Sequence, residues 1–171
     1  MSHKGTLPIN PTKTAMESCI QAVHDCDLFL GIILPRYGSG KEMKENDSVT
    51  HEELKTAIHL NKPRWILAHD HVVFAQKFLW NLGHKTAVER ATLSLEKKDV
   101  MEDLRVIDML EIAMRKDIKL VKDRKGNWVQ EFSDPKDANL FVFSQFRRIA
   151  DAKEIVEENF SKPLDERGNP R

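Results

Sequence analysis

The chain has 171 residues, enough for one domain with a sizeable core. Basic and acidic residues number 27 each, so the formal net charge is zero, which argues against a general nucleic-acid binder. The sequence has no apolar run long enough to span a membrane and no apolar segment of a secretion signal at its start. The two cysteines, Cys19 and Cys26, fall two turns apart in one expected helix, so we expect no disulfide and a cytoplasmic location.

Short apolar strands and amphipathic helices alternate along the first half of the chain. The run over 28–34 is rich in branched residues and shows no alternation, which is typical of a strand buried on both faces. Pro63 precedes a second run of this kind, and Asp70 can cap the helix that follows it. The elements predicted here are a short strand over 5–10, a helix over 14–25, a strand over 28–34, a polar loop over 35–49, a helix over 50–61, a strand over 64–69 and a helix over 70–82.

The second half of the chain leaves one assignment open. The residues from 118 to 132 hold two β-like runs, which form either a hairpin around Gly126 or, in the second run, the last strand of the sheet. Asp134 before Pro135 is a strong signal for the start of a helix. The predicted elements are a charged connection or loose helix over 84–99, a helix over 100–115, the run over 128–132 and a helix over 134–159.

This order of elements predicts an α/β fold. Alternating strands and helices favour a parallel sheet with right-handed crossovers, which gives three layers with helices on both faces. We therefore predict a single domain over residues 1–160, followed by a disordered tail over 161–171.

Three stretches of the chain form a pattern that is found in a known family. They are Cys26 to Ile33 followed by Arg36-Tyr37-Gly38; Ser48 to Leu54; and Asn61-Lys62-Pro63-Arg64 followed by Trp65-Ile66-Leu67. In this order they resemble a family of TIR-like domains of unknown function, over roughly residues 8–155. The resemblance implies a flavodoxin-like fold related to TIR domains and nucleoside deoxyribosyltransferases, in a family whose members often stand at the amino terminus of bacterial proteins that also carry ATPase or repeat modules. We expect the family's first strand–helix unit, which would precede the TLPINP segment, to be missing here, either because the chain is truncated or because that unit has been lost.

Glu53 is the leading candidate for a catalytic residue. The resemblance implies that it takes the place of the glutamate in TIR enzymes and nucleoside deoxyribosyltransferases. Ligands of parallel sheets bind at the carboxyl edge, where a carboxylate in the first turn of the following helix would stay ionised. Such a group can stabilise an oxocarbenium-like ribose during N-glycosidic cleavage. The alternative is structural, because Thr50 and Glu53 have the spacing of a capping box.

The residues that follow the first buried strand form the expected ligand-binding loop. Arg36 can hold a phosphate or carboxylate, Tyr37 can stack on a base, and Gly38 permits a close approach of the backbone. Ser48, in the second stretch of the resemblance, is expected to bind the ligand with them. In the alternative interpretation Arg36 pairs with a neighbouring carboxylate and Tyr37 covers the edge of the sheet.

The histidines suggest a proton donor more than a metal site. His69 and His71 flank Asp70 at a turn expected on the ligand edge, where His69 can contact the ligand. No third ligand has supportive spacing, so we expect neither a metal nor another cofactor.

Two functions of different classes follow. The first is an enzyme of bacterial signalling or defence that binds or hydrolyses NAD or a related nucleotide, as the resemblance implies. The second is a non-catalytic module that associates with itself or a partner protein through the exposed parts of the 70–82 and 134–159 helices. Neither function involves nucleic acid or a membrane.

Overall fold

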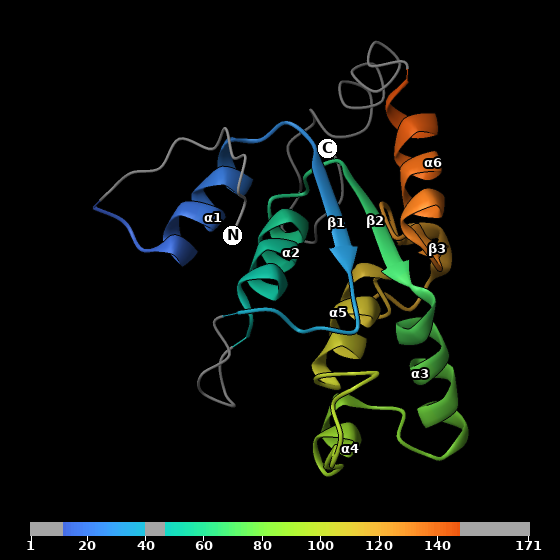
Figure 1. Ribbon diagram of the computed structural model, residues 1–171. Coiled ribbons are helices and arrows are strands. Elements are labelled where there is room, and N and C mark those ends of the chain that lie inside the picture. Colours follow the sequence, from blue (N-terminus) through green and yellow to red (C-terminus); the bar gives the residue numbers. More distant parts are fainter. Residues whose placement is uncertain (1–11, 40–46, 148–171) are drawn as a thin grey trace.

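The computed structural model describes residues 12–39 and 47–147 (Figure 1). The predicted strand over 5–10, the tail over 161–171 and the end of the last predicted helix lie outside the described residues. The elements are α1 (Ala15–Asp25), β1 (Phe29–Ile33), α2 (Val49–His59), β2 (Arg64–His69), α3 (Asp70–Asn81), α4 (Ala87–Ala91), α5 (Arg105–Ala113), a 3-10 turn (Val121–Asp123), β3 (Val129–Phe132) and α6 (Pro135–Phe146).

The three strands form one parallel sheet in the order β1-β2-β3. The central strand places Leu67 opposite Ile32 on one side and opposite Gln130 on the other. The predicted α/β fold with a parallel sheet is thus confirmed. Of the two assignments for residues 118–132, the last sheet strand is correct and the hairpin is wrong, because the run that ends at Phe132 pairs in parallel with β2.

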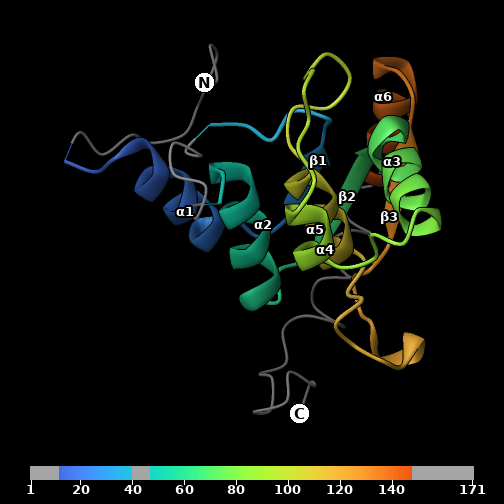
Figure 2. The ribbon, with the colours of Figure 1, turned by 90° about the horizontal axis from the view of Figure 1, so that it is seen from below.

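Helices cover both faces of the sheet (Figures 1 and 2). On one face, α2 and α5 pack over β1 and β2, while α1 packs on the outside of α2. Glycine at position 31 leaves room for the Ile66 side chain on the neighbouring strand, because a Cβ there would lie 2.8 Å from it. On the other face, α6 packs on β3 and reaches β2, where the rings of Trp65 and Phe146 are 5.0 Å apart. The core residues include Ile33, Leu54, Ile66, Ala68, Val72, Val106, Ile107, Met109, Leu110 and Ala113.

The prediction that the run over 28–34 is buried on both faces is wrong. Leu30, Ile32 and Leu34 are exposed, whereas Ile33 on the opposite face is buried. The physical reason is that β1 is an edge strand of the described sheet and that α6 lies over β2 and β3 instead. Apolar composition alone does not show which of the two faces a helix will cover.

Local capping explains where the helices begin. Thr14 and Glu17 form a capping box at the start of α1, which agrees with the helix predicted over 14–25. Helix α2 begins earlier than predicted, since the Ser48 side chain accepts the backbone N–H of His51, and Thr50 is therefore not its cap. At α3 the cap is His69 rather than Asp70. No helix in the described part of the chain is long and apolar enough to cross a bilayer.

Candidate functional site

A buried polar cluster lies beyond the carboxyl end of β1 and joins Tyr37, Asp47 and His51. The Tyr37 hydroxyl lies 2.8 Å from Asp47 Oδ1 and 2.7 Å from His51 Nδ1, which is itself 3.1 Å from Asp47 Oδ1. Lys55 contacts the other carboxylate oxygen of Asp47. All of these contacts form if Tyr37 donates to Asp47 while the His51 Nδ1–H points at both oxygens, a tautomer inferred from the geometry.

The electrostatics of this cluster keep its histidine neutral. Burial lowers the pKa of His51 to about 4 although the Asp47 carboxylate opposes the shift. Burial acts to raise the pKa of Asp47, but hydrogen bonds from Lys55 and Tyr37 outweigh it and bring that pKa to about 2. Burial and the bond to Asp47 raise the pKa of Tyr37. At neutral pH the cluster therefore holds one carboxylate, one neutral imidazole and one phenol.

The loop residues that we expected to bind a ligand together do not share one surface in the structure. Tyr37 is only 1% exposed, and the Arg105 guanidinium lies 4.3 Å from the centre of its ring. Ser48 is fully buried and caps α2. Arg36 is exposed, and Gly38 has a positive φ of 94°, which favours glycine at this turn. The structure thus places Tyr37 and Ser48 inside the fold, with Arg36 on the surface.

Glu53 points away from this cluster and toward α1. It is the fifth residue of α2, beyond the first turn in which we expected it, and it accepts a hydrogen bond from the Cys19 thiol. Burial between the two helices raises the pKa of Glu53. Since Thr50 is not the helix cap, the capping role considered for Glu53 is wrong as well.

His69 lies at the carboxyl end of β2, next to the β3 edge. Its Nδ1 accepts the backbone N–H of His71 and lies 2.8 Å from Asp70 Oδ1, while its ring packs against Phe132. Ligand atoms of His69, Asp70 and His71 all lie within 4.8 Å of one another, so these three residues are the group in the described chain that could hold a metal ion. A cation there would face the positive end of the α3 dipole, which disfavours it.

A second ionic cluster that we did not predict surrounds Arg90. This buried side chain donates to Asp108 at 2.5 Å and to Glu111 at 2.7 Å, and it joins α4 to α5. A cavity of about 470 Å³ adjoins it and is lined by both acidic and basic side chains, including Lys98 and Asp103. The sequence signal was weak, because several charged residues lie between 84 and 99 and only the fold shows which of them is buried.

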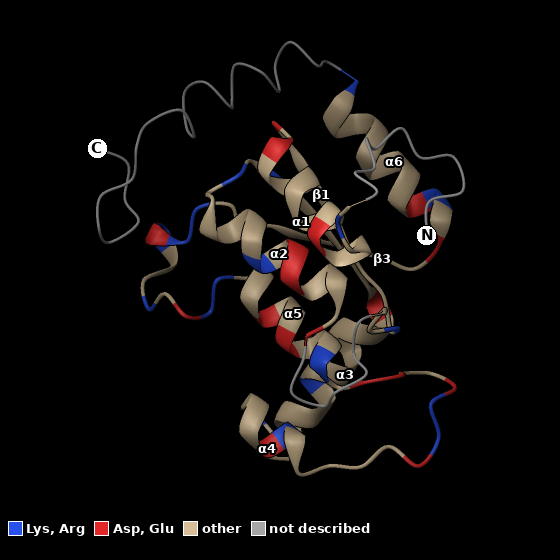
Figure 3. Cartoon of the chain, turned by 90° about the vertical axis from the view of Figure 1, so that its left-hand side faces the viewer, with Lys and Arg blue, Asp and Glu red and all other residues tan. Residues whose placement is uncertain are grey.

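Charges on the side of the molecule formed by α1, α2 and α5 are mixed in sign. Figure 3 shows acidic and basic residues interspersed on these helices, without an extended area of one sign. Among the described residues on that side, this distribution provides no basic surface for a polyanion.

Comparison with known proteins gives a family without a described activity. A family model described as "Domain of unknown function (DUF4062)" matches residues 2–161. Neither a curated protein nor a solved structure matches the chain.

Proposed function

The chain belongs to the family described as Domain of unknown function (DUF4062), and we propose from its own surface that it is a protein-interaction module that self-associates. The observation that carries this proposal is a pair of stacked phenylalanines on the outside of α3. The rings of Phe74 and Phe78 are 5.9 Å apart and nearly parallel, yet the residues are 68% and 51% exposed. Aromatic pairs of this size are usually covered by protein, and exposed apolar groups that cluster mark interaction sites.

Helix α6 offers a second apolar area on the same side of the molecule. Leu140 and Phe143 lie one turn apart on α6 and are 71% and 65% exposed. Figures 1 and 2 both show α3 and α6 on the β3 side of the sheet, away from α1 and α2. Aromatic side chains are enriched at the centres of protein interfaces, whereas charged residues are depleted there. These two helices are also the surfaces that the sequence predicted for association.

The test compares the oligomeric state of the wild type with that of a Phe74→Ser/Phe78→Ser variant by light scattering after gel filtration. We expect the wild type to form a concentration-dependent oligomer and the variant to be monomeric. Val88→Ser is the matched control, because Val88 is also exposed but lies on α4. A wild type that stays monomeric at high concentration would contradict the proposal.

A second candidate is hydrolysis of NAD or a related nucleotide in bacterial signalling or defence, with Glu53 as the catalytic residue. One observation favours it: Glu53 is half-buried and burial raises its pKa, a property shared by many catalytic carboxyl groups. The test is release of nicotinamide from NAD by the wild type and by Glu53→Gln, which keeps the shape of the side chain. Release by the wild type alone supports this function, and no release by concentrated wild type excludes NAD as its substrate.

A further inference from the structure

The segment that connects α5 to β3 concentrates positive charge in a chain without net charge. Residues 115–128, which we call the α5–β3 turn, contain six basic and two acidic residues. Lys119, Lys122 and Lys125 are exposed, and within the described residues their ammonium groups form no hydrogen bond or ion pair. These three charges are therefore available to a partner outside the fold.

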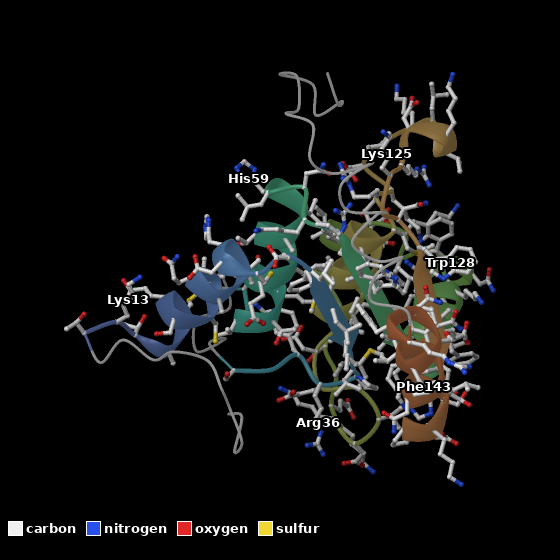
Figure 4. All side chains as sticks on the ribbon, turned by 90° about the horizontal axis from the view of Figure 1, so that it is seen from above. Lys13, Arg36, His59, Lys125, Trp128 and Phe143 are labelled. Atoms are coloured by element: carbon white, nitrogen blue, oxygen red, sulfur yellow. The ribbon has the colours of Figure 1, made fainter. Side chains whose placement is uncertain are left out.

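Large apolar side chains are exposed in the same turn. Leu120 and Val121 lie between two of these lysines and are 56% and 70% exposed. Trp128, directly before β3, is 71% exposed, and Figure 4 shows it on the same flank of the molecule as Lys125. Exposed apolar groups that cluster mark interaction sites, and in this turn lysines adjoin them.

Hydrogen bonds hold the α5–β3 turn in shape. The Arg124 Nε donates to the carbonyl of Ile118 at 2.7 Å, and so closes the turn on itself. The Nη2 of Arg64, on β2, donates to the carbonyl of Lys125 at 3.0 Å, next to Gly126 with its positive φ of 63°. A partner that binds the exposed side chains therefore meets a backbone that is already ordered, which reduces the entropic cost of binding.

The shape of the α5–β3 turn indicates the kind of partner. Figure 2 shows it, in gold, standing out from the layers of helices and strands. Peptides bind in grooves or along open strands, whereas a projection of this kind suits a planar surface such as a bilayer. Lysines attract anionic headgroups, and aliphatic and tryptophan side chains enter the boundary between headgroups and acyl chains. Nucleic acid would stack on aromatic rings but would leave Leu120 and Val121 without a partner.

We propose that the α5–β3 turn binds the surface of an anionic membrane. The three lysines contact the headgroups, Leu120 and Val121 enter the apolar boundary, and Trp128 lies at the interface, where tryptophan is enriched. We expected no membrane partner from the sequence, because the chain has no net charge and no spanning segment. The attraction nevertheless depends on local charge, since salt screens charges more than about 8 Å away at physiological ionic strength. The proposal goes beyond self-association and uses neither α3 nor α6.

Co-sedimentation of the full chain with lipid vesicles tests the proposal. One set of vesicles contains phosphatidylcholine alone, and the other contains three parts of phosphatidylcholine to one part of phosphatidylserine. We expect the chain to bind the anionic vesicles and to bind the neutral ones at least about tenfold more weakly. Binding to the anionic vesicles should decrease as salt is added, because salt screens the lysines.

The first variant removes charge from the turn. Each lysine near an anionic surface contributes about fivefold in affinity, so Lys119→Gln/Lys122→Gln should weaken binding to the anionic vesicles at least about tenfold. Lys97→Gln/Lys98→Gln is the matched control, because it removes the same charge from exposed residues between α4 and α5. The control should bind as the wild type does.

The second variant removes the apolar groups and keeps the charge. Leu120→Ser/Val121→Ser should weaken binding to the anionic vesicles at least about tenfold, because the apolar boundary no longer receives these side chains. Val88→Ser/Val100→Ser is its matched control, since both valines are at least as exposed as Leu120. Circular dichroism checks that all four variants fold, which their exposed positions predict.

An acidic protein segment is the alternative partner, and polyglutamate in solution is its probe. Polyglutamate supplies charge without an apolar layer, so it should bind the wild type and Leu120→Ser/Val121→Ser equally, and more weakly per anionic group than the vesicles do. The proposal is overturned if the anionic vesicles do not bind, if either variant of the turn binds them as tightly as the wild type, or if a control loses as much affinity. Polyglutamate that binds as tightly as the anionic vesicles would overturn it in favour of an acidic protein.

Discussion

The two sides of this molecule differ in whether their charged groups are paired and in whether their aromatic side chains are buried. On the side of α2 and α5, Tyr37, Asp47 and His51 are buried and bonded to one another, and Arg90 has two carboxylate partners. On the side of β3, α3 and α6, Arg64 is buried without a carboxylate partner in the described structure, and large aromatic side chains face outward. On the first side the charged groups are paired with one another, although His51 Nε2 and Arg90 Nε have no hydrogen-bond partner in the described structure. On the second side the charge of Arg64 has no described carboxylate beside it, and the large aromatic side chains are exposed.

The largest effect should come from removing Tyr37 from the completed side. Tyr37→Ala deletes a buried aromatic ring and leaves Asp47 and His51 without their shared partner, so we expect a loss of about 3 to 5 kcal/mol in the free energy of unfolding. Urea denaturation measures this loss. Arg36→Ala, at the exposed neighbour, should stay within about 0.5 kcal/mol of the wild type. Equal losses in the two variants would mean that Tyr37 is not part of a stabilising cluster.

The next effect is a dependence of stability on pH that originates in His51. The unfolded residue takes up a proton near its ordinary pKa of 6.5, whereas the folded residue does so only near 4. Between these values the unfolded state binds more protons, so stability should fall by about 3 kcal/mol as the pH is lowered from 6.5 to 4. Thermal unfolding across this range measures the decline.

His51→Gln tests whether that decline belongs to His51. Glutamine cannot titrate, so the variant should be less sensitive to pH between 6.5 and 4 than the wild type is. The lowered pKa of Asp47 adds a separate loss, but only below the ordinary value of 3.8. A variant whose stability declines as steeply as that of the wild type would place the titrating group elsewhere.

Arg64→Met should change stability much less than Tyr37→Ala does, although both residues are buried. Methionine gives up two hydrogen bonds to carbonyls, but it also removes a buried charge that has no acidic partner among the described residues, and the two effects oppose each other. We expect a change of about 1 kcal/mol or less in urea denaturation. A loss as large as that of Tyr37→Ala would show that Arg64 mainly holds the fold together.

The smallest effect on stability should come from Phe74→Ser/Phe78→Ser. Both side chains are largely exposed, so each substitution should change the monomer's free energy of unfolding by about 0.5 kcal/mol or less. Circular dichroism during thermal unfolding at low protein concentration checks this. A large loss would mean that the stacked pair supports α3 itself.

The sequence predicted the sheet better than the site. The branched runs at β1 and β2, with Pro63 before the second, were sufficient to predict two neighbouring parallel strands. The Asp134–Pro135 pair correctly predicted the start of α6. These signals are local, because they depend on the period of the apolar residues and on the chemistry of single caps.

The site residues depend on packing between distant segments, which local patterns do not contain. Glu53 points toward α1 because of the way α1 and α2 pack, and no spacing within α2 shows that. Tyr37 was predicted to stack on a ligand, yet its hydroxyl is bonded to Asp47 and His51 inside the fold. Arg64 is the first residue of an apolar strand. This position in the sequence was the signal that its side chain would be buried.

Sedimentation equilibrium of the wild type and the Phe74→Ser/Phe78→Ser variant tests most directly whether the β3 side is a surface for association. The proposed function predicts that the average mass of the wild type rises with concentration, while that of the variant stays at the mass of one chain. A wild type that keeps the mass of one chain throughout, or a variant that associates as strongly as the wild type, would contradict it.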